Sequence, residues 1–254
     1  MCPNSSVDLR IKNFHNNQHF LDLQNSYSKV GDCTWRNNNF LRKHLQSSRS
    51  LFTDSSLLSR NPRPKKLEVY ALLSGISFSD KIMSRLQFIQ QEISVILSDS
   101  LYYWVSPWNL GVEYAVFKWP DDVWKKNNST QIKKTLKLID CPVFDFSIYG
   151  IQINPDGCVI AKGYDEGGSI FNIRKKLKQD LSFLPEKQSN WAHIPIGRIL
   201  EPIDTKKFTK LRSFVRKYKD KLIVEDNLTS VKYVHETRWY MEEKNILLEV
   251  NFKR

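Results

Sequence analysis

The sequence predicts an α+β fold in which two antiparallel sheets surround a central cleft and helices lie outside them. From residue 67 onward, short strand-like apolar segments alternate with segments of helical periodicity, and strong turn signals separate them. Strand, helix and strand clusters occur in two similar halves of this region. Because each sheet has to bury a face against another layer, this order favours one two-lobed domain over residues 67–254.

The first half is predicted to contain three strands and two helices. In chain order they are a strand at 67–73, a helix at 80–96, strands at 102–105 and 111–119, and a short helix from Ser129 or Thr130 to 139. Asp80 can cap the first helix, whose apolar residues recur at spacings of four and three. Pro142 ends the second helix, because proline lacks the amide hydrogen that a helix needs.

The second half is predicted to contain strands and helices in the same alternation. In chain order they are strands at 143–153 and 158–162, a helix at 169–184, a strand at 191–200, a helix at 204–218, and strands at 222–240 and 245–252. Asn154-Pro155-Asp156-Gly157 is typical of a hairpin turn. Ser169 and Asp204 can cap the two helices, and Asp226-Asn227 is expected to interrupt the long strand at 222–240.

Residues 1–66 differ from the rest and are expected to form a loosely ordered N-terminal arm. They are rich in Asn and Ser, weakly patterned, and carry +7 of the net charge of +12. The arm is predicted to dock a protein partner or remain a plain extension; its composition also resembles an organelle transit peptide. The overall positive charge favours anionic partners such as RNA or a nucleotide.

Several classes of site and location are not indicated by the sequence. No run of 18 apolar residues exists, so no membrane span is expected, and no signal-peptide core is visible. The four cysteines are scattered, which favours reduced thiols in the cytoplasm. No pair of side chains has convincing metal-ligand spacing, so we expect neither a metal nor another cofactor.

Two short segments 82 residues apart carry the chemical information. The later one is Trp191-Ala192-His193-Ile194-Pro195-Ile196-Gly197-Arg198-Ile199-Leu200, and the earlier one is Asn109-Leu110-Gly111-Val112-Glu113-Tyr114. Over residues 67–254 the order of elements and these segments resemble the 2H phosphoesterase superfamily, the RNA 2′,5′-ligase and cyclic phosphodiesterase-like proteins. That resemblance implies two His-x-Thr/Ser motifs, one on a central strand of each lobe, with both histidines facing the cleft.

Only one of the four motif positions that the resemblance implies is retained. His193 stands at the second histidine, while Pro195 occupies its hydroxyl position; Gly111 and Glu113 occupy the first histidine and hydroxyl positions. In the two-histidine reaction one imidazole removes a proton and the other supplies one, each contributing about 10²–10⁴-fold. Glycine cannot transfer a proton and proline cannot hold a phosphate oxygen, so an unmodified 2H mechanism is not expected.

Replacement groups for the lost histidine are available in the sequence. Glu113 would act as a general base if burial raised its pKa, and with His193 would form a new acid–base couple. His235, on the strand at 231–235, would enter the cleft from the second lobe. His193 and His235 are alternatively hydrogen-bonded structural residues, and a decayed site is the simpler interpretation.

Further candidate binding residues surround the motifs. Arg198 is expected either to bind an anion or to pair with a carboxylate. Trp104 and Trp108 lie in an aromatic cluster around the first motif, where they would stack on bases or pack in a core or interface. The basic runs at 174–178 and 212–221 are expected to be solvated helix faces, or part of a nucleic-acid footprint.

Three hypotheses remain from the sequence. The first is a non-catalytic or weakly catalytic 2H-like domain that binds RNA, a nucleotide or another anionic ligand. The second is an active, divergent phosphodiesterase acting on RNA ends or cyclic nucleotides, with Glu113 and His193 as its catalytic couple. The third is a structural or interaction subunit that docks through residues 1–66.

Overall fold

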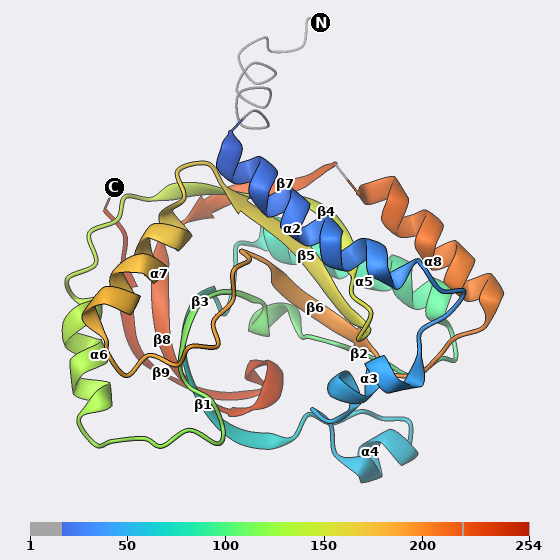
Figure 1. Cartoon of the computed structure of the whole chain (residues 1–254), viewed down its shortest axis with the longest axis horizontal. Coiled ribbons are helices and arrows are strands. Elements are labelled where there is room, and N and C mark those ends of the chain that lie inside the picture. The colour runs from blue at the N-terminus through green and yellow to red at the C-terminus, as the bar shows by residue number, and fades with distance from the viewer. Residues whose placement is uncertain (1–16, 220, 254) are drawn as a thin grey trace, which may run out of the picture.

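The computed structural model describes residues 17–219 and 221–253 and contains two sheets with helices around them (Figure 1). The strands are β1 (Lys66–Gly75), β2 (Tyr102–Trp104), β3 (Gly111–Lys118), β4 (Phe144–Ile153), β5 (Cys158–Asp165), β6 (Ile194–Ile199), β7 (Leu222–Leu228), β8 (Ser230–Arg238) and β9 (Glu243–Asn251). One sheet has the order β3-β1-β8-β9 and the other β2-β6-β5-β4-β7. Every adjacent pair within them is antiparallel, which confirms the predicted fold class.

Helices cover the outer faces of both sheets. They are α2 (Gln18–Thr34), α3 (Arg42–Arg49), α4 (Asp54–Leu58), α5 (Asp80–Leu97), α6 (Asn128–Leu136), α7 (Ser169–Asp180) and α8 (Thr205–Tyr218), with two short 3₁₀ turns, η1 (Pro107–Asn109) and η2 (Trp239–Met241). Figure 1 shows α2 running along the sheet that contains β4 and β5, with α8 near the C-terminal end of α2. Ser79 rather than Asp80 caps α5, since its side chain accepts a hydrogen bond from the Ile82 amide.

The two sheets are not built from consecutive halves of the chain. β2 leaves the first half to pair with β6 in the second sheet, and β8 and β9 return from the C-terminal region to complete the first sheet. The interruption predicted at Asp226-Asn227 falls at Thr229, between β7 and β8, where the chain passes from one sheet to the other. Sequence periodicity reports single elements, whereas these exchanges depend on pairing between distant strands.

Residues 17–66 correct the expectation of a loosely ordered arm. Over this range the chain forms α2, α3 and α4, while residues 1–16 of the expected arm lie outside the described residues. Phe20, Leu23 and Tyr27 of α2 are buried in the main core, and the Tyr27 hydroxyl donates to the Gly163 carbonyl at 3.2 Å. These apolar residues recur at spacings of three and four, so α2 has one apolar face that the second sheet covers.

The segments that carry the chemical motifs lie on neighbouring strands of different sheets. Gly111 and Glu113 are on β3, at one edge of the first sheet; His193 directly precedes β6 of the second sheet, and Pro195 is its second residue. Positions two apart on a strand share a face. The fold therefore brings both motif faces toward the space between the sheets.

Candidate functional site

A cavity of about 430 Å³ lies between the two sheets, and all four motif positions line it: Gly111, Glu113, His193 and Pro195. Arg198, Glu236 and the η2 residues Trp239, Tyr240 and Met241 also line it, with Trp119 and Leu73 on the apolar side. The volume falls within the range of small-molecule sites. The expected central site is therefore a real concavity, although its chemical groups are not those of a two-histidine centre.

Gly111 is closely covered by its neighbours in the cavity wall. A Cβ atom added at this position would lie 2.7 Å from the Cδ1 atom of Leu73 and 3.2 Å from the Ser74 carbonyl oxygen. Leu73 is itself a cavity residue on the adjacent strand β1, where it pairs with Glu113. The absence of a histidine at position 111 is thus matched by a leucine methyl group packed over the glycine.

Two carboxyl groups face the cavity from the first sheet. Burial raises the pKa of Glu113, and the nearby Arg174 guanidinium opposes that increase. Burial, together with the proximity of Glu113, raises the pKa of Glu236 to about 7, against the opposing effect of a hydrogen bond from the Met241 amide. Two close carboxylates disfavour ionising together, so near neutral pH the pair holds a proton.

His193 enters the cavity from the second sheet as a neutral imidazole. Burial, together with the positive charges of Arg174 and Arg198, lowers its pKa to about 4. Its Nδ1 atom is buried with no hydrogen-bond partner among the described residues. A ring of Trp191 packs edge-on against the imidazole at 5.6 Å, and the Trp191 Nε1 donates to Ser26 of α2. The helix α2 thus holds Trp191, which in turn packs against His193.

Arg174 connects the two sheets beneath the cavity, although the sequence placed it in a solvated basic run. Its guanidinium donates to the carbonyl oxygens of Glu113 (2.5 Å) and Tyr114 (3.0 Å) on β3 and of Trp191 (2.7 Å) before β6. Its Nη1 atom is buried without a partner in the part of the chain that the structure describes. Its position four residues after the buried Ile170 and three before the buried Leu177 was the available signal that it faces inward.

Arg198 pairs with a carboxylate, one of the two outcomes expected for it. Its Nη1 donates to Asp156 at 2.6 Å and to the Ser48 hydroxyl at 2.8 Å, and its Nε donates to the Tyr240 hydroxyl at 2.7 Å. These contacts join β6 to α3, to the β4–β5 turn and to η2. The side chain lines the cavity, but most of its hydrogen-bonding capacity holds the surrounding elements together.

The η2 turn closes one side of the cavity in a strained conformation. Tyr240 and Met241 both have positive φ angles, 64° and 57°, which non-glycine residues adopt only when their surroundings enforce it. Glu236 accepts from the Met241 amide at 2.9 Å, and Lys244 donates to the Met241 carbonyl at 2.9 Å. Glu236 and Tyr240 were not recognised from the sequence; a carboxylate at an inward-facing position of the alternating strand β8 was the signal for the first.

Three sequence candidates do not line the cavity. The Trp104 ring packs over Gly197, where a Cβ atom would lie 2.1 Å from it, and its Nε1 donates to Ser94 of α5. Trp108 is 62% exposed on η1. His235 lies on β8 in the first sheet, not the second lobe, stacked on Tyr70 at 4.4 Å with its Nε2 3.3 Å from Glu68. It neighbours Glu236, so alternation along β8 directs it to the opposite face.

Two further kinds of feature are absent from the described residues. No group of three or more His, Cys, Asp or Glu side chains is placed to hold a metal ion within 17–219 and 221–253. No helix in that same part of the chain combines the length and the apolar character needed to cross a bilayer.

Known structures share this fold. The chain matches TT0787 of Thermus thermophilus at 11% identity and a TM-score of 0.53, over 72% of this chain and 97% of that one. It matches E. coli LigT complexed with phosphate at 8% identity and 0.52, over 75% and 100%. It matches ATU0111 of Agrobacterium tumefaciens, a conserved protein of unknown function, at 10% and 0.54, over 73% and 86%.

Comparisons by sequence give no match. No protein-family model and no curated protein matches the chain. The structural matches nevertheless confirm the fold that the order of elements and the two motif segments predicted, which this chain shares with TT0787 and E. coli LigT.

Proposed function

We propose that the central cavity binds a nucleotide or a related phosphate ester and that this chain does not carry out the two-histidine phosphodiesterase reaction. The observation that carries the proposal is the convergence of all four motif positions on one cavity that contains a single histidine. This arrangement keeps a concave site between the sheets, whereas one of the two proton-transfer groups is missing.

Structures with the same fold support the choice of ligand class. E. coli LigT has been solved with phosphate, with 3′-AMP and with NADP⁺, at TM-scores of 0.52, 0.51 and 0.51 to this chain. In this chain the cavity offers Trp119 and Trp239 as apolar surfaces and His193 as a hydrogen-bonding group. Aromatic side chains of this kind stabilise bases by about 1–3 kcal/mol each.

Glu113 and Glu236 line the cavity, but their protonation allows an anion to bind beside them. Because burial raises both pKa values, the pair carries less negative charge near neutral pH than two free carboxylates would. A protonated carboxyl group also donates a hydrogen bond, which a phosphate oxygen accepts. We therefore expect nucleotide affinity to increase as the pH falls through about 7.

The proposal is tested by titration calorimetry with 3′-AMP at low salt, from about two pH units below to about two above the Glu236 pKa. We expect binding by the wild type, affinity at least fivefold weaker in His193→Ala, and a pH dependence that Glu236→Gln flattens. The ligand phosphate titrates in the same way with the wild type and with Glu236→Gln, so the difference between their pH profiles reports Glu236 alone. Glu186→Gln, an exposed carboxylate outside this cavity, is the matched control. Absence of 3′-AMP binding would refute the proposal.

A second candidate function is a divergent phosphodiesterase that uses Glu113 and His193. The observation favouring it is that Glu113 faces the cavity rather than a lobe core. Its raised pKa suits a general acid, while His193, with a pKa of about 4, is a weak base until a bound phosphate adds negative charge. This candidate predicts turnover that both Glu113→Gln and His193→Ala abolish, with Glu186→Gln unaffected.

A further inference from the structure

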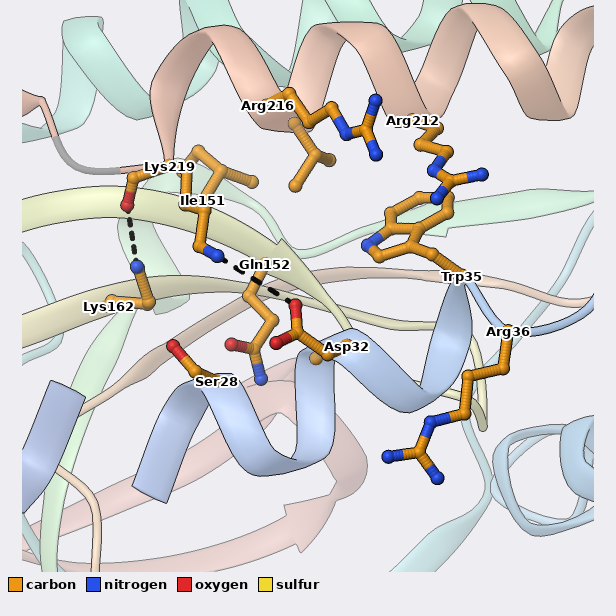
Figure 2. A pocket seen from close by; sticks show the side chains of 12 residues that line it. Ser28, Asp32, Trp35, Arg36, Ile151, Gln152, Lys162, Arg212, Arg216 and Lys219 are labelled. Atoms are coloured by element: carbon orange, nitrogen blue, oxygen red, sulfur yellow. Dashed lines mark hydrogen bonds and ion pairs between the residues drawn. The ribbon is translucent and has the colours of Figure 1, made fainter. Parts of the chain in front are cut away.

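A second pocket, separate from the central cavity, lies between α2 and α8 on the outer side of the second sheet (Figure 2). It has a volume of about 350 Å³. It shares no residue with the central cavity. We refer to it as the α2–α8 pocket, and it is lined by Ser28, Gly31, Asp32, Trp35, Arg36, Ile151, Gln152, Lys162, Arg212, Val215, Arg216 and Lys219.

One face of each helix forms the walls of this pocket. Ser28, Asp32 and Trp35 are spaced by four and three along α2 and its C-cap, and Arg212, Arg216 and Lys219 are spaced in the same way along α8 and its C-cap. Residues at these spacings share a helix face. Gly31 permits the close approach of α2 to the sheet, since a Cβ atom there would lie 2.6 Å from the Gln152 side chain.

The pocket is strongly basic. Its lining contains the five cationic side chains Arg36, Lys162, Arg212, Arg216 and Lys219, against one acid, Asp32. Asp32 lies 3.9 Å from the Lys219 ammonium, and the buried Lys162 ammonium donates to the Lys219 carbonyl at 2.6 Å. Figure 2 shows Arg212 and Arg216 descending from α8 above Trp35 and Asp32. Even without counting Lys162, the single carboxylate of this lining cannot neutralise its four other cations.

Helix dipoles account for only part of this charge. Cations are favoured near a helix C-terminus, which explains Arg216 and Lys219 at the end of α8. Arg212 lies further from that end, so the helix dipole does not account for its position. In addition, the Arg212 Nε is buried without a hydrogen-bond partner among the described residues. A buried donor without a partner is costly, and an anion in the pocket would supply the missing acceptor.

We propose that the α2–α8 pocket binds a multiply charged phosphate group, a phosphomonoester or a pyrophosphate, on a small molecule. The excess of cations exceeds what a singly charged phosphodiester would neutralise, and the pocket is a recess between helices rather than an extended groove. Arg212 and Arg216 bind the phosphate oxygens, and the Trp35 ring at the pocket wall contacts the remainder of the ligand. This site does not depend on the function proposed for the central cavity.

Isothermal titration of the full chain with inorganic pyrophosphate, inorganic phosphate and AMP tests this proposal. We expect pyrophosphate to bind most tightly and the double variant Arg212→Gln/Arg216→Gln to weaken it at least tenfold. The charge-matched control is Lys206→Gln/Lys210→Gln, two exposed positions of the same helix outside the pocket, which should change affinity less than twofold. Arg36→Gln, an exposed position on the opposite wall, should weaken binding without lowering the unfolding temperature.

Three outcomes would overturn the proposal. No pyrophosphate binding by the wild type, or equal weakening in both double variants, would show that the pocket has no specific phosphate site. Stronger binding of a single-stranded RNA without terminal phosphates, increasing with its length and lost in Arg212→Gln/Arg216→Gln, would assign the pocket to a nucleic-acid backbone instead. Loss of pyrophosphate binding in His193→Ala with no effect of Arg212→Gln/Arg216→Gln would place the phosphate in the central cavity.

Discussion

At the scale of single residues, the electrostatics of the central cavity depend on three buried titratable side chains. Glu236 and Glu113 have raised pKa values, and His193 has a lowered one. In each case burial is the largest cause, because a low-dielectric environment disfavours the charged form. Near neutral pH the cavity therefore contains a neutral imidazole and an incompletely ionised pair of carboxyl groups, in place of the two imidazoles implied by the resemblance.

The pKa of Glu236 predicts a specific dependence of stability on pH. Its folded-state pKa of about 7 is above the ordinary value of 4.5, so the folded chain binds the extra proton and stability is lost as the pH rises from about 4.5 to about 7. Relative to the wild type, Glu236→Gln should gain about 3 kcal/mol of unfolding free energy between about pH 4.5 and about pH 8. Urea denaturation across this range measures the gain; Glu186→Gln should show none, and a flat difference for Glu236→Gln would contradict the assignment.

His193 contributes to stability with the opposite sign. Its folded-state pKa of about 4 is below the ordinary 6.5, so its contribution is complete above pH 6.5 and is lost as the pH falls toward 4. Glu236→Gln removes the contribution of Glu236, which decreases with pH over the same range. In this variant, the unfolding free energy should therefore rise with pH between about 4 and 6.5. Adding His193→Gln to that variant should reduce the rise, and denaturation curves of the two variants provide the comparison.

Arg198 is predicted to act mainly through stability. Its contacts with Asp156, Ser48 and Tyr240 hold four elements together. Arg198→Gln should lower the unfolding free energy by about 2 kcal/mol, because it leaves Asp156 without its charged partner. A double-mutant cycle with Asp156→Asn should give a coupling of about 1 kcal/mol or more. Zero coupling together with unchanged stability and weaker nucleotide binding would make Arg198 an anion-binding residue instead.

At the scale of elements, α2 is part of the core rather than a detachable arm. Its Tyr27 is completely buried, donates to the Gly163 carbonyl and packs against Tyr164 and Trp191. Trp191 in turn contacts His193. The helix therefore links the N-terminal region to the motif at the central cavity.

Substitution on the two faces of α2 tests this integration. Tyr27→Ala should lower the unfolding free energy by about 4 kcal/mol, as expected when a large buried ring leaves a void. Leu21→Ala, 37% exposed on the same helix, should lower it by less than about 1 kcal/mol. Chemical denaturation distinguishes the two variants. Similar small effects would mean that α2 contributes little to the folded core.

The individual strands and helices after residue 66 were predictable because their periodicity and turns are local. The helix expected to reach residue 184 ends at Asp180, and the motif strand begins at Ile194 rather than 191. The apolar residues Phe20 and Leu23 leave room for a single docking element, but the Asn- and Ser-rich composition outweighed them, and the helix α2 was not predicted. Local periodicity indicates that Arg174 and Glu236 face inward, whereas the groups that they contact depend on pairing between distant strands.

At the scale of the whole molecule, a shared fold positions a different set of side chains from the set that the resemblance implies. The same two-sheet architecture is found in E. coli LigT and TT0787 at 8% and 11% identity, and the four motif positions still meet at one cavity. In this chain those positions hold a glycine, a glutamate, a histidine and a proline. A fold can be retained while the groups it positions change, so function has to be argued from the cavity itself.

We have proposed that the central cavity binds a nucleotide and that the two-histidine reaction does not take place there. The most direct test of this proposal is the turnover of 2′,3′-cyclic-ended and 2′,5′-linked oligonucleotides by the wild type and by His193→Ala, in preparations for which 3′-AMP binding is measured in parallel. We expect 3′-AMP binding by the wild type and no turnover above buffer in either protein. Turnover by the wild type that His193→Ala abolishes would contradict it and establish a phosphodiesterase rebuilt around that histidine.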